Sequence, residues 1–464
     1  MTVIGEVLLH DLRIAAPAFR IEEATTPALL AAYHRLRHQE FVAGQGLFSG
    51  SDLDDRDADP RTVVLVARSG DGEVLGGVRL GPVTDGPDLG WWQGGRLVAR
   101  PTPAARGVGA ALVRAACARA ENSGVLRFEA VVQTRHQEFF SRLGWRTRPE
   151  APDPQRYPTP HRWMRWPIGR IAALVDVTKR DLGALLAGLT PGGSGFNGDD
   201  GAPVPGSDLI AACDAILPSM VERDPEWAGW CAVLVNLNDL AAMGATPVGL
   251  LDALGARDRS FASRVLAGLR RASQAYAVPI LGGHTQFGVP AALSVTALGH
   301  TVSPVPGGGG RPGHEVRLAA DLGGGWRPGY AGRQWDSTSG RTTAELRAML
   351  GAVGTARPAA AKDVSMAGLV GTLGMLAEAS GCAAVLDVAA VPRPAQASVG
   401  DWLTCFPGFA MLTADRPGAA PLPAGPAVSA ACGELTTGHG VQLRWPDGEL
   451  TEAITDQVTG MGTA

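Results

Sequence analysis

Lysine is almost absent from this chain of 464 residues. Only Lys179 and Lys362 occur, so arginine supplies 39 of the 41 basic residues (41 − 2). Where arginine fills nearly every basic position, a retained lysine marks either chance or a place that needs a compact ammonium group. The residues support the two interpretations equally.

Paired cysteines, basic runs and long apolar runs are also missing. The six cysteines form no Cys-x-x-Cys pair, which favours reduced and mostly buried thiols. With no basic run and a net charge of −4, the chain does not resemble a general nucleic-acid binder. No run of about 18 uncharged apolar residues predicts a membrane span, and residues 1–14 lack the basic and apolar regions of a signal peptide. We therefore expect a cytoplasmic protein.

Proline, by contrast, is concentrated in residues 149–168. Its density there interrupts helices and sheet ladders alike, which predicts a semi-stiff linker. The prolines are Pro149, Pro152, Pro154, Pro158, Pro160 and Pro167. A chain of this length has room for two to four domains. Together with a glycine- and proline-rich hinge at 302–313, the linker predicts domains at 1–148, 169–304 and 305–464.

The region before the linker alternates short β-branched runs with helical patterns. Thr26-Pro27 predicts the start of one helix, and an alanine-rich stretch that ends near Ala120 predicts another. Between strand and second helix stands the glycine turn 106–110, RGVGA. Free N–H groups at a helix start bind anionic oxygen, so this order is a phosphate-binding arrangement. We expect strands at 19–23, 61–68, 73–80, 95–100 and 125–132.

Together with the segment 139–145, FFSRLGW, this unit resembles the GNAT superfamily of acyl-CoA N-acyltransferases. The resemblance implies a mixed central sheet with helices on both faces, and acetyl-CoA or another acyl-CoA as cofactor. Residues 37–45 and the acidic segment 52–57 are also similar to one GNAT branch and to acyltransferases associated with nitrogen starvation. The residues implied for acyl-CoA binding are Val98, Arg106, Gly107, Val108, Gly109 and Ala110.

Two departures from the family pattern concern the transfer chemistry. Ala104 stands where the motif begins with Gln or Arg, and Phe140 replaces the tyrosine that often protonates the leaving thiolate. Glu129 and Glu40 are candidates for the base that deprotonates the amine, although a structural role for Glu129 is slightly favoured. We expect the acidic run 52–59 to be a solvated loop, with attraction of an amine substrate as the alternative.

The segment 235–247, VNLNDLAAMGATP, organises the rest of the chain. The preceding run 231–237 is short and rich in β-branched residues, which predicts a buried strand. Asn236, Asn238 and Asp239 then predict the start of a helix, because these residue types cap helices. A carboxylate at such a junction suits a hard cation such as Mg²⁺ that carries a nucleotide.

Three further motifs surround this segment in a defined order. Gly198-Asp199-Asp200-Gly201 precedes it, Asp214 ends the apolar run 209–213, and the segment 281–285, LGGHT, closes another strand. The order resembles the aminoimidazole ribonucleotide (AIR) synthetase superfamily, which includes thiamine-monophosphate kinase and selenophosphate synthetase. The resemblance covers residues 171–464. It implies a β-barrel-forming α/β domain followed by an α+β domain, with ATP and Mg²⁺ as cofactors and a homodimer as the assembly.

The same resemblance implies roles for single residues. His284 stands where the kinase branch has Asp, so we expect it to contact phosphate or substrate rather than metal. Lys179 and His284 are the implied catalytic residues. The implied metal ligands are Asp200, Asp214, Asp239 and Asp363. The implied nucleotide contacts are Gly198, Asn236, Gly282, Gly283, Lys362 and Ser365.

We therefore expect a bifunctional enzyme of small-molecule nitrogen metabolism, α/β and α+β in fold, that acts on an amine or amide and binds neither nucleic acid nor membrane. The N-terminal domain is expected to be an acyl-CoA-dependent N-acetyltransferase. The remainder is expected to use ATP and Mg²⁺ for phosphoryl transfer or for activating an amide or carboxylate. One alternative is an ATP-dependent enzyme whose N-terminal domain only senses acyl-CoA, and another is a pair of folds kept for binding without catalysis.

Overall fold

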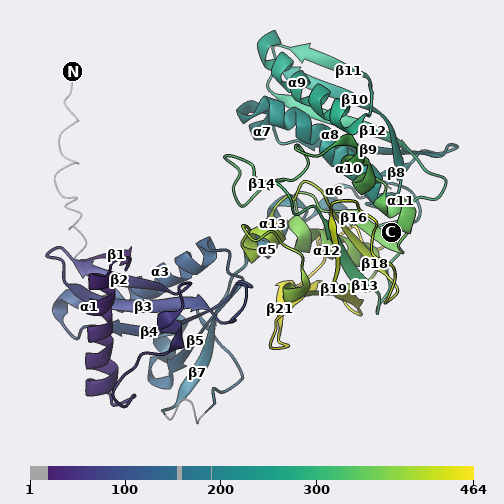
Figure 1. The fold of residues 1–464 in the computed structure, drawn as a ribbon. Coiled ribbons are helices and arrows are strands. Elements are labelled where there is room, and N and C mark those ends of the chain that lie inside the picture. Colours follow the sequence, from purple (N-terminus) through teal and green to yellow (C-terminus); the bar gives the residue numbers. More distant parts are fainter. Residues whose placement is uncertain (1–18, 154–158, 190) are drawn as a thin grey trace, which may run out of the picture. The chain divides into compact units, whose positions relative to one another are not determined.

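The computed structural model describes residues 19–153, 159–189 and 191–464, which form two compact units with a boundary between Ile168 and Gly169 (Figure 1). Residues 1–14, weighed above for a signal peptide, and two prolines of the expected linker, Pro154 and Pro158, lie outside the described residues. No helix in the described part of the chain is long and apolar enough to cross a membrane.

A seven-stranded sheet forms the centre of the first unit, in the order β1-β2-β3-β4-β5-β7-β6. Only β4 and β5 pair in parallel; the other neighbours are antiparallel. The strands are β1 (Phe19–Glu23), β2 (Val63–Ser69), β3 (Val74–Pro82), β4 (Trp91–Ala99), β5 (Arg127–Gln133), β6 (Arg146–Thr147) and β7 (His161–Trp166). The helical segments are α1 (Pro27–Arg37), the π-helix η1 (His38–Gly44), α2 (Asp55–Ala58), η2 (Pro103–Ala105), α3 (Val108–Asn122), η3 (Thr134–His136) and α4 (Gln137–Arg142).

Helices cover both faces of this sheet, as the GNAT resemblance predicted (Figure 1). Successive residues of a strand point to opposite faces, so β2 contributes to two cores. Val63 and Leu65 pack in the core that contains Leu112 of α3. Val64 packs instead in the core that contains Tyr33 of α1. The five expected strands correspond to β1 to β5, with the largest difference at the start of β4, which is Trp91 rather than residue 95.

The second unit is built on two larger sheets. The first has the order β11-β10-β12-β9-β8, and the second has the order β16-β18-β13-β19-β17-β20-β21. The strands of the first sheet are β8 (Ala202–Pro203), β9 (Leu209–Ile216), β10 (Thr246–Ala256), β11 (Ile280–Phe287) and β12 (Ala292–His300). Those of the second are β13 (Glu315–Ala320), β16 (Ala360–Asp363), β17 (Ala383–Asp387), β18 (Ala410–Asp415), β19 (Val428–Thr436), β20 (Val441–Arg444) and β21 (Leu450–Ile454).

Helices and a short hairpin complete the second unit. The hairpin is β14 (Gly325–Trp326) with β15 (Trp335–Asp336). The helices are α5 (Arg170–Thr178), α6 (Leu182–Leu185), α7 (Pro218–Arg223), α8 (Pro225–Ala242), α9 (Arg259–Tyr276), α10 (Thr343–Leu350), α11 (Ala352–Ala356), α12 (Gly368–Ala379), η4 (Val388–Ala390) and α13 (Val399–Thr404). All six cysteines are free and five are buried, in line with the expectation; Cys213 is exposed.

Helix α8 corrects the prediction of a strand-to-helix junction at residues 231–247. Residues 225–242 form one continuous helix, and nearly every residue of it is buried. A helix enclosed on all sides is apolar all round, so its sequence lacks the periodicity that separates a helix from a strand. Gly229 and Gly268 lie where α8 crosses α9; a Cβ at Gly268 would stand 1.9 Å from the Glu226 carbonyl oxygen.

One face of the first sheet of the second unit remains open. Alternate residues such as Leu250 and Leu254 pack in the core with α8 and α9. The outer strand β11, in contrast, is exposed along nearly its whole length. Large exposed apolar side chains occur on β10 and β11: Val248, Leu251, Ile280, Leu281 and Phe287.

Candidate functional site

The first unit has a cleft between strands that separate. β4 and β5 pair only from Trp91 with Arg127 to Gly94 with Ala130, although both strands continue. At that point β4 contains a bulge, and Arg96 has a φ of +54°. The cleft has a volume of about 710 Å³ and is lined by both strands, η1, α3 and α4.

The glycine turn lies at the N-terminus of helix α3, as expected. Gly107 has a φ of +83° and precedes the first helical residue, Val108. The N–H groups of a first helical turn lack partners within the helix, so they are free to bind an anion. Of the residues implied for acyl-CoA binding, Gly109 and Val98 line the cleft. Arg106 directly precedes Gly107 in the glycine turn, and Ala110 lies in the first turn of α3.

Glu40 is the one expected base that lines the cleft, among the residues that the structure describes. It lies on the π-helix η1, and its Oε1 accepts a hydrogen bond of 2.7 Å from Gln45 Nε2. Gln45 Oε1 in turn accepts from Gln133 Nε2 at 3.2 Å and Arg135 Nη2 at 2.9 Å. Glu40 Oε2 has no hydrogen-bond partner within the described residues. The carboxylate is therefore oriented by one oxygen and available at the other.

Glu129 does not line the cleft, which corrects its interpretation as a base. Its side chain is 1% exposed and forms ion pairs with Arg127, Arg148 and Arg165 at 3.1, 2.8 and 2.5 Å. Trp91 Nε1 donates a further hydrogen bond of 3.0 Å. With its oxygens engaged in this way, Glu129 has the structural role that the sequence slightly favoured.

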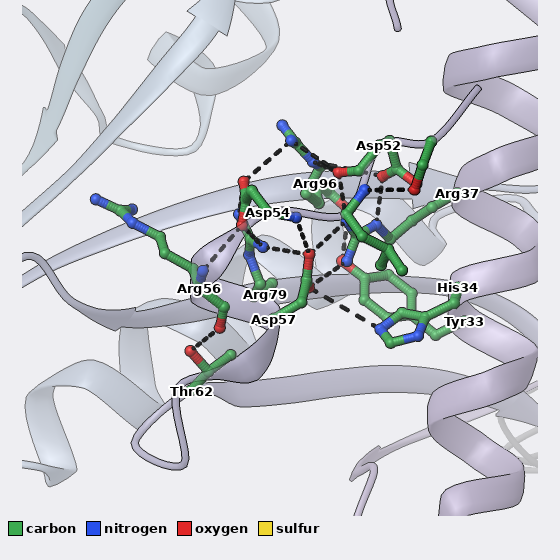
Figure 2. Close-up of polar contacts among 12 residues, drawn as sticks. Tyr33, His34, Arg37, Asp52, Asp54, Arg56, Asp57, Thr62, Arg79 and Arg96 are labelled. Atoms are coloured by element: carbon green, nitrogen blue, oxygen red, sulfur yellow. Dashed lines mark hydrogen bonds and ion pairs between the residues drawn. The ribbon is translucent and has the colours of Figure 1, made fainter. Parts of the chain in front are cut away.

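The acidic run 52–59 is only in part the solvated loop that we expected: Asp54 and Asp55 are exposed, but two other aspartates are enclosed. Asp52 and Asp57 have side chains that are only 2% and 8% exposed. Arg37 donates to Asp52 Oδ2 and to Asp57 Oδ1, each at 2.6 Å (Figure 2). Arg79 also pairs with Asp57, at 2.7 Å. Because the charges of Asp52 and Asp57 are compensated inside the protein, these two carboxylates are not available to attract an amine.

Asp54 is the more exposed member of this network. It accepts hydrogen bonds from Arg79 and, at 3.1 Å, from Arg96 Nη2 (Figure 2). Burial would raise the pKa of Asp54, but the hydrogen bond and charge of Arg79 outweigh it and lower that pKa. Asp54, Arg79 and Arg96 all line the cleft. Sequence reasoning missed Arg79 and Arg96, because no pattern links residues of β3 and β4 to the acidic run.

In the second unit, acids from four different elements converge. Asp200 follows the glycine-rich segment, Asp214 is on β9, Asp239 is on α8 and Asp363 ends β16. Burial, followed by the charges of Asp363, Asp214 and Asp200, raises the pKa of Asp239 well above its usual range. Burial together with Asp200 and Asp214 does the same to the pKa of Asp363. These carboxyl groups are therefore close enough to disfavour one another's ionisation.

Both lysines of the chain lie at this carboxylate cluster. Lys362 is buried, and its Nζ donates to Asp200 Oδ1 at 2.9 Å and to the Gly198 carbonyl oxygen at 3.0 Å. Lys179 lies close enough to oppose the burial that raises the pKa of Asp214. Of the two interpretations of the retained lysines, the geometry supports the need for a compact ammonium group.

The donor set of this cluster fits Mg²⁺, a hard cation that prefers carboxylate oxygen. Asp363 is 3% exposed, and its Oδ2 is buried without a hydrogen-bond partner. As folded, however, no group of three or more His, Cys, Asp or Glu side chains in the described ranges is arranged to hold a metal ion. The Asp200 carboxylate is shared between Lys362 and the Asp363 N–H. A cation therefore requires side chains to rearrange around it.

Asn236 has a different role from the nucleotide contact expected. It is fully buried; its Oδ1 accepts from the Asp214 N–H at 3.0 Å, and its Nδ2 donates to the Ala232 carbonyl oxygen at 2.8 Å. The Oδ1 bond joins α8 to β9, and the Nδ2 bond lies within α8. Asn236 positions Asp214 rather than facing a ligand. Ser365, in contrast, lies just before α12 and is partly exposed, as the expectation requires.

His284, Gly282 and Gly283 lie apart from the acids. All three belong to the outer strand β11, where His284 pairs with Ala253 of β10. Ala253 pairs with Ser294 of β12, and Ser294 with Ala215 of β9. With strands about 4.8 Å apart, the His284 backbone is about 14 Å from the strand that carries Asp214. Within one chain, therefore, the structure does not bring His284 into the carboxylate cluster.

Three family models match separate parts of the chain. Residues 28–145 match the acetyltransferase (GNAT) family. Residues 198–301 match the N-terminal domain of AIR synthase related proteins, and residues 336–441 match their C-terminal domain. The order of the three matches is the order in which the two resemblances occur in the sequence.

Curated relatives match up to about half of this chain. The uncharacterized protein sll0787 of Synechocystis sp. is 37% identical over 227 residues, which are 47% of this chain and 70% of that protein. Selenide, water dikinase of Myxococcus xanthus is 30% identical over 242 residues, or 47% of this chain and 67% of that protein. Thiamine-monophosphate kinases also match, and this chain spans 38 to 48% of their length. The solved thiamine monophosphate kinase of Aquifex aeolicus covers 55% of this chain, and the alignment covers 92% of that structure, with a TM-score of 0.41 and 20% identity.

Proposed function

We propose that this chain, which belongs to the AIR synthase related proteins and carries an acetyltransferase (GNAT) family domain ahead of them, is a bifunctional enzyme of small-molecule nitrogen metabolism. The first unit transfers an acyl group from acyl-CoA, in the first instance acetyl-CoA, to an amine. The second unit uses ATP and Mg²⁺ to transfer a phosphoryl group or to activate an amide or carboxylate. The convergence of four acids with both lysines carries this proposal.

In the first unit, acyl transfer rests on Glu40 and the glycine turn. Bound acyl-CoA supplies an activated thioester. The first turn of α3, after Gly107, receives the pyrophosphate on its free N–H groups. Glu40 Oε2 takes a proton from the incoming amine, while Gln45 holds Oε1.

The alternative of an acyl-CoA sensor has one observation in its favour. Phe140 lines the cleft with a ring that has no hydroxyl to protonate a thiolate. In the described ranges no tyrosine lines the cleft; Tyr33, the nearest in sequence to Glu40, donates its hydroxyl to the Arg96 carbonyl oxygen at 2.8 Å. A transferase and a sensor both bind acyl-CoA, and only the transferase releases free CoA in the presence of an amine.

Release of the CoA thiol from acetyl-CoA, measured across a panel of amines, tests the first unit. Replacing Glu40 by Gln is expected to lower turnover about 100-fold or more, because the base is lost while the fold is kept. The matched control is Glu138→Gln on α4, whose exposed carboxylate pairs only with Arg142. Full activity in Glu40→Gln, or no thiol release with any amine, contradicts the transferase assignment.

In the second unit, the chain's own residues hold and balance charge. Asp200, Asp214, Asp239 and Asp363 are the proposed ligands of Mg²⁺, which would neutralise the phosphates of the nucleotide. Lys362, which contacts Asp200, and Lys179, whose charge acts on Asp214, are the proposed partners of phosphate oxygen when the acids take up the cation. Asn236 holds Asp214 in place, and Ser365 precedes the helix α12 beside Asp363.

Hydrolysis or transfer of the ATP γ-phosphate tests this assignment. Asp239→Asn is expected to abolish Mg²⁺-dependent ATP turnover. It is not expected to lower thermal stability, because burial beside Asp363 already disfavours the charge of Asp239. Asp208→Asn is the control, since Asp208 is exposed and lies beside His300. ATP turnover that survives in Asp239→Asn contradicts the proposed site.

The open face of the first sheet supports a homodimer. Leu281 and Phe287 are 56% and 53% exposed on the outer strand β11, which has free edge hydrogen-bonding groups. In the proposed dimer, a second copy of the same face covers these side chains. Light scattering of the purified chain is expected to give a dimer, and Leu281→Arg a monomer. A monomeric wild-type chain overturns this part of the proposal. We place the enzyme in the cytoplasm.

A further inference from the structure

Arg96 is held in an uncommon backbone conformation at the bulge of β4. Its φ of +54° is rare for a residue with a side chain, and such outliers occur where the surrounding structure enforces them. Here the Tyr33 hydroxyl, fully buried, donates to the Arg96 carbonyl oxygen. The guanidinium carbon lies 4.4 Å from the centre of the Phe48 ring. Backbone and side chain are thus both fixed in a residue that lines the cleft.

The hydrogen bonds of Arg96 leave one nitrogen available. Nη2 donates to the Asp52 carbonyl oxygen at 2.9 Å and to Asp54 Oδ2 at 3.1 Å, and Nε donates to the Asp52 carbonyl oxygen at 3.2 Å. Nη1 has no partner among the residues that the structure describes. Figure 2 shows this guanidinium at the edge of the network, away from Tyr33 and His34.

The two ion pairs of Arg96, with Asp52 at 3.4 Å and with Asp54 at 3.1 Å, are longer than those of Arg37 and Arg79. Asp52 is 2.6 Å from Arg37 Nε but 3.4 Å from Arg96 Nε, and Asp57 is bound by Arg37 and Arg79. Burial, together with the charge of Arg79, therefore lowers the pKa of Arg96. A partly buried guanidinium in this state is stabilised by an anion that enters the cleft.

Glu40, whose Oε2 has no partner among the described residues, lines the same cleft. A ligand that satisfies both groups carries an amine for Glu40 and an anion for the N–H groups of Arg96 Nη1, and a carboxylate oxygen accepts such charge-assisted hydrogen bonds. We infer that the acceptor of the first unit is an amino acid or a related amine with a carboxylate, and that Arg96 binds this carboxylate. The inference rests on the acyltransferase function proposed above.

The resulting reaction balances with the groups named. The acceptor nitrogen forms an amide bond to the acyl carbon, and the thioester C–S bond breaks. Glu40 Oε2 takes one proton from the amine, and the leaving thiolate takes one from solvent. No oxidant, reductant or further co-reactant is required.

Pairs of substrates that differ only in the carboxylate test the inference. The full-length chain is given each proteinogenic amino acid and its decarboxylated amine, for example phenylalanine with phenethylamine and tryptophan with tryptamine. Release of the CoA thiol gives kcat/KM, and calorimetric titration in the presence of CoA gives affinity. A charge-assisted pair with a carboxylate predicts a preference of about 10- to 100-fold for at least one amino acid over its amine.

Variants link this preference to Arg96. Arg96→Gln is expected to remove the preference, and Arg96→Lys, which keeps the charge and protects the fold, to leave a reduced one. Arg61→Gln is the control, because Arg61 also pairs with an aspartate, Asp59, but does not line the cleft. Unchanged binding of acetyl-CoA verifies that each variant is folded.

The outcomes separate this inference from the transferase itself. Amines that are acetylated as well as their amino acids, or a preference that persists in Arg96→Gln, overturn the inference and leave the transferase intact. Amino acids that bind through Arg96 without release of CoA refute the transferase, and they overturn the acceptor role of the amino acid while leaving Arg96 as a carboxylate-binding residue. If no amino acid binds and none is acetylated, the inference is wrong.

Discussion

Replacing Arg37 by Met should destabilise the first unit more than any other single change in its ion-pair network. Arg37 is fully buried and donates from Nε, Nη1 and Nη2 to Asp52 and Asp57. Methionine fills similar space but supplies no donor, so two buried carboxylates lose a partner. Removing one partner leaves a buried charge without full compensation, and the resulting loss of stability greatly exceeds the net stabilisation that the ion pair provides.

The structure indicates the size of the effect. Removing one partner of a buried ion pair costs about 3–5 kcal/mol. Asp57 retains Arg79 at 2.7 Å and Asp52 retains Arg96 at 3.4 Å, so the lower end applies. We expect a loss of about 3 kcal/mol in the free energy of unfolding. For a domain of this size such a loss lowers the melting temperature by roughly 6–12 °C.

Urea unfolding of the full-length chain measures this loss. The transition of the first unit is identified as the one that acetyl-CoA stabilises. Arg37→Lys keeps one charge but lacks the three-pronged geometry, so an intermediate loss is expected. A double-mutant cycle with Asp52→Asn should give a coupling energy of about 1 kcal/mol or more. A loss below about 1 kcal/mol in Arg37→Met would refute the network as a stabilising element, because that is within the range of ordinary surface changes.

Two further predictions follow from the same kind of argument. Burial would raise the pKa of Asp57, but hydrogen bonds from Arg37 and the charge of Arg79 lower it to about 2 in the folded state. The contribution of Asp57 to the free energy of unfolding is therefore present above the unfolded pKa of 3.8 and is lost as the pH falls toward 2. Urea unfolding at pH 5, 4 and 3 should show a steeper decline in this free energy for the wild type than for Asp57→Asn. Parallel declines would contradict the assignment. Gly268→Ala should destabilise the second unit by about 1–3 kcal/mol in thermal unfolding, despite the higher helix propensity of alanine. The reason is that the added Cβ would stand 1.9 Å from the Glu226 carbonyl oxygen. Gly169→Ala is the control and should be neutral, because a Cβ there meets nothing within 4 Å. Equal effects of the two alanines would mean that the α8–α9 crossing is not tightly packed.

Much of the first unit could be predicted from local sequence. Strand β1, the start of α1 at Thr26-Pro27 and the turn at Gly107 depend on residues next to one another, so periodicity and capping reveal them. The buried network around Arg37 depends on residues of α1, β3 and β4 that meet only in the folded chain. A run of aspartates by itself gives no indication of the arginines that will enclose it.

In the second unit, the order of the motifs indicated the family but not every local structure. The amides Asn236 and Asn238 resemble helix caps, yet they lie inside α8 because their side chains bond to Asp214, Ala232 and the Gly408 carbonyl oxygen in the core. The glycines and histidine of 282–284 belong to a strand, as expected. Their distance from the acids depends on strand order, which the spacing of motifs does not encode.

Calorimetric titration of the full-length chain with acetyl-CoA and, separately, with Mg²⁺–ATP tests the central claim most directly. Two independent ligand sites, one in each unit, predict that both titrations give saturable binding in the wild type. In Asp239→Asn, binding of Mg²⁺–ATP should be lost while binding of acetyl-CoA is unchanged. Failure of the wild type to bind Mg²⁺–ATP, or equal binding of it by Asp239→Asn, would contradict the assignment of the carboxylate cluster as the nucleotide site.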